Sequence, residues 1–113
     1  MTFGEAMKTL RREANVTQRA LADEVGVDFS YISKLENGHL PAPAADTVVK
    51  VCEVLGVPPE RLLSLTGKLP TDVQEAVGGS PAAQQFMRSA QQLGITEREW
   101  LHLGEEMRRL REE

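Results

Sequence analysis

The side chains with the most reactive chemistry are few and lie far apart in the sequence. Cys52 is the single cysteine of the 113 residues, so the chain cannot form an internal disulfide. His39 and His102 lack the spacing of metal ligands. The sequence offers no nucleophile with a nearby base, no useful cluster of carboxylates and no glycine loop that would cradle phosphate. We therefore expect neither an enzyme nor a metal or other cofactor, and we expect Cys52 to pack in the core.

One spacing becomes specific when its members are taken together. Counting from Gln18, the small residue Ala22 falls where two helices cross closely, and Gly26 falls where the backbone needs a positive φ. Ile32 and Leu35 fall where the second helix rests on the first. Three further apolar residues fill the space between them: Leu21, Val25 and Val27. An ordinary helical hairpin does not require all of these residues at these offsets, so the set predicts a helix-turn-helix.

Periodic apolar residues predict the helices that position this motif. A first amphipathic helix carries Phe3, Ala6, Met7, Leu10 and Ala14. The short second helix is capped by Thr17 and ends at Gly26. The third helix runs from about Asp28, as its cap, to about Asn37, where Asn37-Gly38 stops it after about three turns.

Two more helices complete the expected N-terminal domain. An irregular connector over residues 39–43 leads to a fourth helix, which begins near Asp46 or Thr47 and ends at Gly56. Pro58-Pro59 opens a fifth helix, which Gly67 ends. Its expected apolar face consists of Leu62, Leu63 and Leu65. We place the domain over residues 1–67.

The pattern changes after Gly67, and residues 68–113 are expected to form a short helical region for dimerisation or regulation. A brief helix near Asp72 to Val77 precedes a helix capped by Ser80 and started by Pro81. Thr96 and Glu99 form a capping box for the last helix. An apolar stripe at coiled-coil spacing follows, made of Trp100, Leu103, Met107 and Leu110. This stripe either closes over the fifth or seventh segment of its own chain or pairs with a second copy; we favour a homodimer.

Composition favours an all-α protein, because aromatic content is 4% and Gly and Pro are sparse inside the periodic segments. No apolar run approaches the ~20 residues that span a bilayer, so we expect no membrane partner. The single cysteine and the lack of a secretory signal pattern at the amino terminus favour a cytoplasmic location. The net charge is −4, yet residues 1–68 are nearly balanced, with eight Lys/Arg against nine Asp/Glu. A near-neutral domain binds DNA if its positive charges gather on one face, although its non-specific affinity is then weak.

The motif residues resemble the Cro/cI-type, or Xre, helix-turn-helix regulators over roughly residues 3–67. The matching segments are Thr17-Gln18 through Leu21-Ala22, Gly26-Val27, residues 31–38 and Leu55-Gly56-Val57. The resemblance implies a five-helix, lambda-repressor-like domain that binds double-stranded DNA. It also implies a dimeric repressor that reads a near-palindromic operator with its third helix in the major groove.

The resemblance assigns roles to particular residues. Base edges would be met by Phe29, Ser30, Ser33 and Lys34, and the DNA backbone by Arg11, Thr17, Gln18, Tyr31 and Asn37. The base-reading positions hold no Gln, Asn or Arg for bidentate contacts, so indirect readout is expected to contribute. Phe29 has core packing as its alternative. Arg11, which the resemblance pairs with Glu36, either faces the backbone or ties the first helix to the third.

Two further functions remain open for a chain of this kind. In one, it is the antitoxin of a toxin pair, and its acidic C-terminal region holds a basic toxin. In the other, a partner peptidase inactivates the repressor by cutting the C-terminal region, around Gly67 to Ser80. Both functions keep the DNA-binding domain over residues 1–67. They differ from the dimeric repressor in the partner that residues 68–113 bind.

Overall fold

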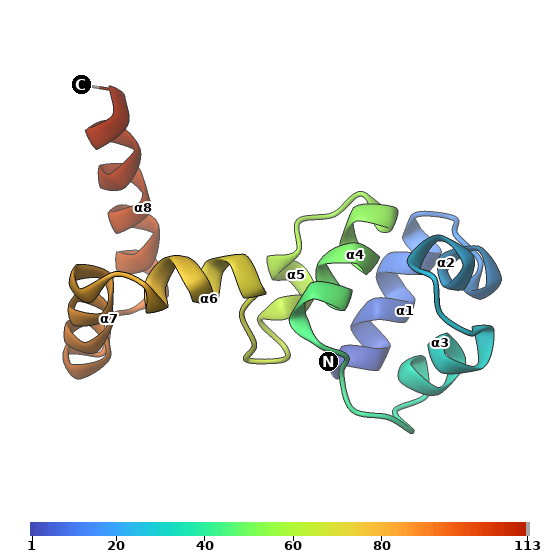
Figure 1. The fold of residues 1–113 in the computed structure, drawn as a ribbon. Coiled ribbons are helices and arrows are strands. Elements are labelled where there is room, and N and C mark those ends of the chain that lie inside the picture. The colour runs from blue at the N-terminus through green and yellow to red at the C-terminus, as the bar shows by residue number, and fades with distance from the viewer. Residues whose placement is uncertain (113) are drawn as a thin grey trace. The chain divides into compact units, whose positions relative to one another are not determined.

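The structure is a computed structural model that describes residues 1–112, and within that range it contains α-helices and no strands. The helices, shown in Figure 1, are α1 (Phe3–Glu13), α2 (Gln18–Val25), α3 (Phe29–Glu36), α4 (Ala45–Leu55), α5 (Glu60–Leu63), α6 (Thr71–Gly78), α7 (Pro81–Leu93) and α8 (Glu97–Glu112). None of these helices is both long and apolar enough to cross a membrane.

The helices begin and end where local sequence signals place them. Thr2 and Glu5 form a reciprocal capping box at the start of α1, and the Thr17 hydroxyl accepts a hydrogen bond from the Ala20 N–H at the start of α2. α2 ends at Gly26, whose φ of 86° lies in the left-handed region that glycine adopts without strain. The expected cap at Asp28 precedes α3, but its side chain makes no capping hydrogen bond.

One hydrophobic core holds α1 to α5 together. Its fully buried side chains are Met7, Leu21, Ile32, Leu35, Val48, Val51, Cys52 and Leu62. α3 packs on α1 and α2, while α5 packs on α4 and α1. The predicted inward positions Ile32 and Leu35 and the predicted core position Cys52 are confirmed. Burial of each large apolar side chain stabilises the domain by ~1.5–3 kcal/mol.

Three details of the expected helices are wrong. α3 has eight residues, about two turns rather than three, because Asp28 and Asn37 are its caps. α5 ends at Leu63 rather than at Gly67, so Leu65 lies in the turn that follows and is 45% exposed. Ala14 is exposed because it caps α1 at its C-terminal end. In the last two cases the helix stops before the periodic apolar pattern does.

The chain divides into two compact units, Met1–Gln74 and a second unit that begins at Glu75. The first unit extends beyond Gly67 because its later residues bond back to the start of α4. The Thr71 N–H and hydroxyl donate to the Asp46 carboxylate at 2.9 and 2.7 Å, which lowers the pKa of Asp46 below its ordinary value. Lys68 Nζ donates to the carbonyl oxygens of Ala42 and Pro43, both at 3.2 Å.

The second unit contains α7 and α8. Ser80 caps α7 by accepting from the Ala83 N–H at 3.1 Å, and Pro81 occupies the first helical position. Thr96 and Glu99 form the expected capping box before α8, and the hydrogen bonds that the Thr96 N–H and hydroxyl donate to the Glu99 carboxylate lower the pKa of Glu99. Among the described hydrophobic side chains of this unit, only Ala90 is buried. The unit by itself therefore has almost no core.

Candidate nucleic-acid interface

The turn between α2 and α3 has the geometry that the sequence spacing predicts. The N–H groups of Gly26 and Val27 both donate to the carbonyl oxygen of Ala22, at 2.8 and 3.0 Å. Ala22 is fully buried, so its small side chain lets α3 approach α2 closely. Gly26 then redirects the chain so that α3 starts three residues later, and the two helices pack against each other (Figure 1).

α3 has one buried face and one exposed face. Ile32 and Leu35 lie in the core, whereas Ser30 and Lys34 are exposed and Ser33 is half-buried. Phe29 is 42% exposed, so it does not fold back into the core, the alternative that the sequence left open. The residues predicted to meet bases therefore share the side of α3 that faces away from the domain, as the helical repeat requires.

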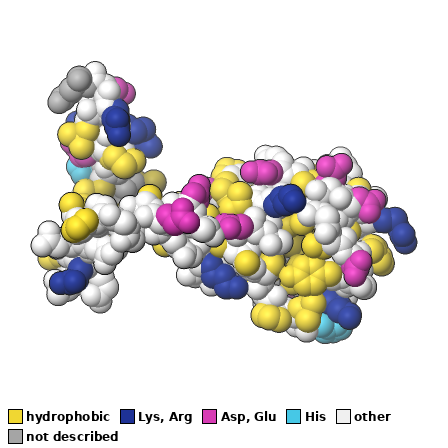
Figure 2. Space-filling view, in the orientation of Figure 1, with side chains coloured by type: hydrophobic (Ala, Val, Ile, Leu, Met, Phe, Trp, Pro, Cys, Tyr) yellow, Lys and Arg dark blue, Asp and Glu magenta, His cyan; other side chains and the backbone are white. Residues whose placement is uncertain are grey.

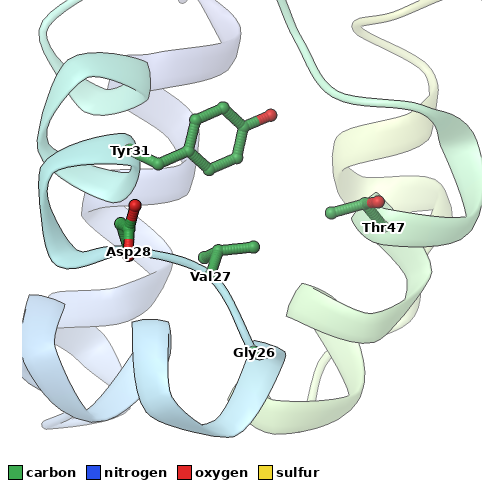
Figure 3. Close-up of a pocket in the computed structure, with 5 residues that line it drawn as sticks. All are labelled: Gly26, Val27, Asp28, Tyr31 and Thr47. Atoms are coloured by element: carbon green, nitrogen blue, oxygen red, sulfur yellow. The ribbon is translucent and has the colours of Figure 1, made fainter.

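The predicted backbone contacts lie around the motif. The Thr17 hydroxyl oxygen accepts the capping hydrogen bond, which leaves its O–H able to donate, and Asn37 is exposed at the end of α3. Tyr31 is half-buried and lines a shallow, open pocket between the turn and the start of α4. Figure 3 shows its ring extending from α3 toward the side on which Thr47 lies. In Figure 3 the phenol oxygen lies at the end of the ring that extends toward this side.

A buried polar network ties α1, α2 and α3 together. The Glu36 carboxylate accepts hydrogen bonds from Arg11 Nε at 2.6 Å, Arg11 Nη2 at 3.0 Å and Gln18 Nε2 at 2.9 Å. Arg11 Nη1 also donates to the carbonyl oxygen of Val16 at 2.9 Å. Arg11 and Glu36 are 8% and 5% exposed, and the hydrogen bond with Glu36 raises the pKa of Arg11. The guanidinium thus serves first to hold the helices in place.

Gly4 is a position that sequence reasoning missed. A Cβ atom on Gly4 would lie 2.3 Å from the carbonyl oxygen of Leu35 and 2.8 Å from that of Glu36, so only glycine fits between α1 and the end of α3. Gly4 does not need its backbone freedom, since it is helical; it needs to have no side chain. The available signal was a glycine on the apolar face of the first helix, three residues before Met7.

Arg19 is the second position that sequence reasoning missed. Its guanidinium carbon lies 4.9 Å from the centroid of the Phe29 ring, within the ~6 Å range of a cation–π contact. Arg19 is exposed at the start of α2, and Phe29 begins α3. The contact therefore places a positive charge beside the exposed face of α3.

Comparison with known proteins identifies the family. A helix-turn-helix family model matches residues 7–62. The uncharacterized HTH-type transcriptional regulator RghRB of Bacillus subtilis (strain 168) is 30% identical over 113 aligned residues, which cover 92% of this chain and 81% of that protein. The chain belongs to the Xre-type helix-turn-helix transcriptional regulators. The resemblance of its motif residues to this family is confirmed.

Other relatives align over a shorter stretch of the regulator. The HTH-type transcriptional repressor RghR of Bacillus subtilis is 37% identical over 75 residues, covering 66% of this chain and 55% of that protein. A propionyl-CoA carboxylase regulator of Cereibacter sphaeroides is 29% identical over 75 residues, covering 66% of this chain and 16% of that protein. Both are named as regulators, which agrees with the family assignment.

The fold of the regulator matches a solved structure along nearly its whole length. A chain of a SinR protein/SinI protein complex superimposes with a TM-score of 0.52 at 21% identity, covering 99% of this chain and 100% of that chain. At this identity the match concerns the fold. The all-α fold, a helix-turn-helix domain followed by further helices, is confirmed.

The apolar stripe of α8 is mostly exposed in the regulator. Met107 and Leu110 are 61% and 74% exposed, and Leu103 is half-buried. Trp100 packs against Phe86 of α7 with ring centroids 6.5 Å apart, so the first residue of the stripe does meet the seventh helix of its own chain. The rest of the stripe has no such contact among the aromatic and core contacts of the described residues.

The charged side chains of the first unit are mixed in sign on the face shown, and its single thiol is buried. Acidic and basic side chains are interspersed over the face of the first unit that Figure 2 shows. On this face the cations do not gather into one broad positive patch. Burial raises the pKa of the Cys52 thiol, which leaves it protonated in the core.

Proposed function

We propose that the regulator is a dimeric repressor that reads a near-palindromic operator with α3 in the major groove. The observation that carries this proposal is the exposed face of α3, with Ser30 and Lys34 opposite the buried Ile32. A helix fits the width of the major groove, and residues on its outer face then meet base edges. The names of the related proteins, one of them a transcriptional repressor, support repression as the mode of regulation.

Base reading in this proposal rests on short polar side chains and one lysine. Lys34 Nζ donates to guanine O6 or N7, and the hydroxyls of Ser30 and Ser33 donate to or accept from nearby base edges. Such contacts discriminate less per base pair than the ~1–3 kcal/mol of a bidentate contact. Sequence-dependent deformability of the operator supplies part of the specificity.

Phosphates are bound at the edge of the motif by Thr17, Gln18, Tyr31 and Asn37. Gln18 Nε2 gives one N–H to Glu36 and has a second for a phosphate oxygen. For Arg11, the sequence left a backbone role and a structural role open. Its buried contacts with Glu36 and Val16 favour the structural role, through which Arg11 acts on DNA by positioning Gln18.

A second copy of the chain covers the apolar surface of the second unit in this proposal. The exposed apolar side chains there are Phe86, Met87, Leu93, Trp100, Leu101, Met107 and Leu110. A stable domain of this size usually needs its own core, and Ala90 alone is too little for one. A two-fold dimer would bring two motifs together and so match a near-palindromic operator.

The DNA-reading proposal is tested with duplexes that the protein retains from a random-sequence pool. We expect two half-sites whose centres lie about 10 base pairs, one helical turn, apart. Lys34→Ala should lower affinity for the selected duplex about tenfold and relax the preference at one position of each half-site. Lys50→Ala, which removes an exposed lysine from α4, is the matched control and should change neither. A pool with no enriched sequence would refute sequence-specific reading.

The dimer proposal is tested by placing charge in the stripe of α8. The variant Met107→Glu with Leu110→Glu should sediment as a monomer at concentrations where the wild type is a dimer, and it should lose cooperative binding to paired half-sites. Both side chains are exposed within one chain, so the fold should persist. Leu69→Glu changes a leucine of the first unit that is also exposed, at 50%, and serves as the control. If the variant still formed dimers, the stripe would not be the dimer interface. It would then be assigned to a different protein partner, such as a toxin or a peptidase.

A further inference from the structure

The cation–π contact between Arg19 and Phe29 joins the first turns of the two helices of the motif. Arg19 is the second residue of α2 and follows Gln18, while Phe29 is the first residue of α3. Both side chains are exposed, with 42% of Phe29 accessible. The contact therefore lies on the surface beside Ser30 and next to the predicted phosphate ligand Gln18.

The guanidinium of Arg19 has no anionic partner among residues 1–112. It takes part in none of the ion pairs or side-chain hydrogen bonds of these residues, although Asp23 stands four residues further along α2. Pairs with this spacing lie on the same helical face and commonly join. Arg19 instead lies over the Phe29 ring, so its charge is held in place without being neutralised.

Contact with an aromatic face leaves the hydrogen-bonding capacity of arginine unused. The ring attracts the cation through its quadrupole, and the five N–H groups lie in the guanidinium plane, where they remain able to donate. Two of them match the spacing of two oxygens of a phosphate. An arginine held by a ring and free of carboxylates is well suited to bind an anion.

We propose that Arg19 binds a backbone phosphate of the operator and that Phe29 is the positioning residue that holds its guanidinium there. The inference rests on the proposed DNA-binding function and adds an arginine to an interface for which the sequence predicts few cations. In a docked helix-turn-helix the first helix crosses the backbone while the second enters the groove. Arg19, on the first of these helices, is thus placed for phosphate rather than for a base edge.

The experiment measures affinity for a duplex selected from the random pool, and for a random duplex of equal length, at several salt concentrations. Arg19→Ala should weaken binding to both duplexes by a similar factor, roughly tenfold. The slope of log affinity against log salt should fall in magnitude by about 0.9, as expected for the loss of one phosphate contact. Arg61→Ala removes an exposed arginine from α5, which packs on α4 and α1, and should change neither quantity.

The role of Phe29 is tested by a double-mutant cycle. Phe29→Leu should weaken binding and move the salt slope toward that of Arg19→Ala, and Phe29→Trp should restore both because indole is the strongest cation–π partner. In the Arg19→Ala background, Phe29→Leu should have no further effect. If the two substitutions instead lowered DNA affinity additively, and Phe29→Leu changed the base preferred at one position, Phe29 would be a base contact. Its positioning role would then be overturned.

Failure of this inference is separable from failure of the proposed function. If the wild type enriches a specific duplex and Lys34→Ala impairs it, the regulator reads DNA whatever Arg19 does. An unchanged affinity and salt slope in Arg19→Ala would then remove Arg19 from the interface. Thermal unfolding followed by circular dichroism should give the same midpoint for Arg19→Ala and the wild type, because the side chain is exposed.

Discussion

Glu36→Ala is expected to lower the free energy of unfolding by about 3–5 kcal/mol, measured by urea denaturation. The substitution leaves the Arg11 guanidinium buried without the carboxylate that accepts two of its hydrogen bonds, at 2.6 and 3.0 Å. It also removes the acceptor of Gln18. Since a small domain has ~5–15 kcal/mol of stability in total, this variant should be partly unfolded at moderate temperature.

A paired replacement separates the buried charge from the shape of the site. Arg11→Met combined with Glu36→Met removes both charges and fills similar space, so it should recover most of the lost stability. Its DNA affinity should stay below that of the wild type, because Gln18 is no longer oriented by Glu36. If Glu36→Ala alone lowered the free energy of unfolding by less than about 1 kcal/mol, water would reach Arg11 and the network would contribute little to stability.

Gly4→Ala is expected to destabilise the first unit by about 1–3 kcal/mol, even though alanine has the higher helix propensity. The added Cβ would lie 2.3 Å from the carbonyl oxygen of Leu35, a backbone atom that cannot rotate away. α1 and α3 must separate, and the exposed face of α3 then moves relative to α2. The midpoint temperature of thermal unfolding and the affinity for the selected duplex should therefore both fall.

The sign of the stability change in Gly4→Ala is informative because helix propensity favours alanine whereas packing against α3 favours glycine. Gly78→Ala, at the end of α6, meets no atom within 4 Å and has no positive φ, so it should be neutral or slightly stabilising. A Gly4→Ala variant as stable as Gly78→Ala would contradict the close approach of α1 to α3.

The motif itself was predictable because its signals are local. Thr17 caps the helix that directly follows it, Gly26 adopts the φ of 86° that the turn needs, and Ile32 and Leu35 follow the helical repeat. Capping and periodicity act within a few residues, so a single sequence contains them. The same local reasoning predicted the Ser80 cap and the Thr96–Glu99 capping box of the second unit.

Helix ends were less predictable than helices. Ala14 and Leu65 continue an apolar pattern but are exposed, because α1 has reached its cap and α5 has ended. Periodicity states which face a residue would occupy if the helix continued. It does not state whether the helix continues, which depends on the packing of the elements that follow.

The sequence by itself determined the all-α fold, the helix-turn-helix spacing and, through the family that its motif resembles, the pairing of Arg11 with Glu36. Only the tertiary structure decided that Gln18 shares this carboxylate, that Gly4 touches the end of α3, and that Arg19 lies over Phe29. Each of these contacts joins two different helices. Their distances depend on how closely and at what angle the helices pack, which is set by the whole core and leaves no pattern in the residues that meet.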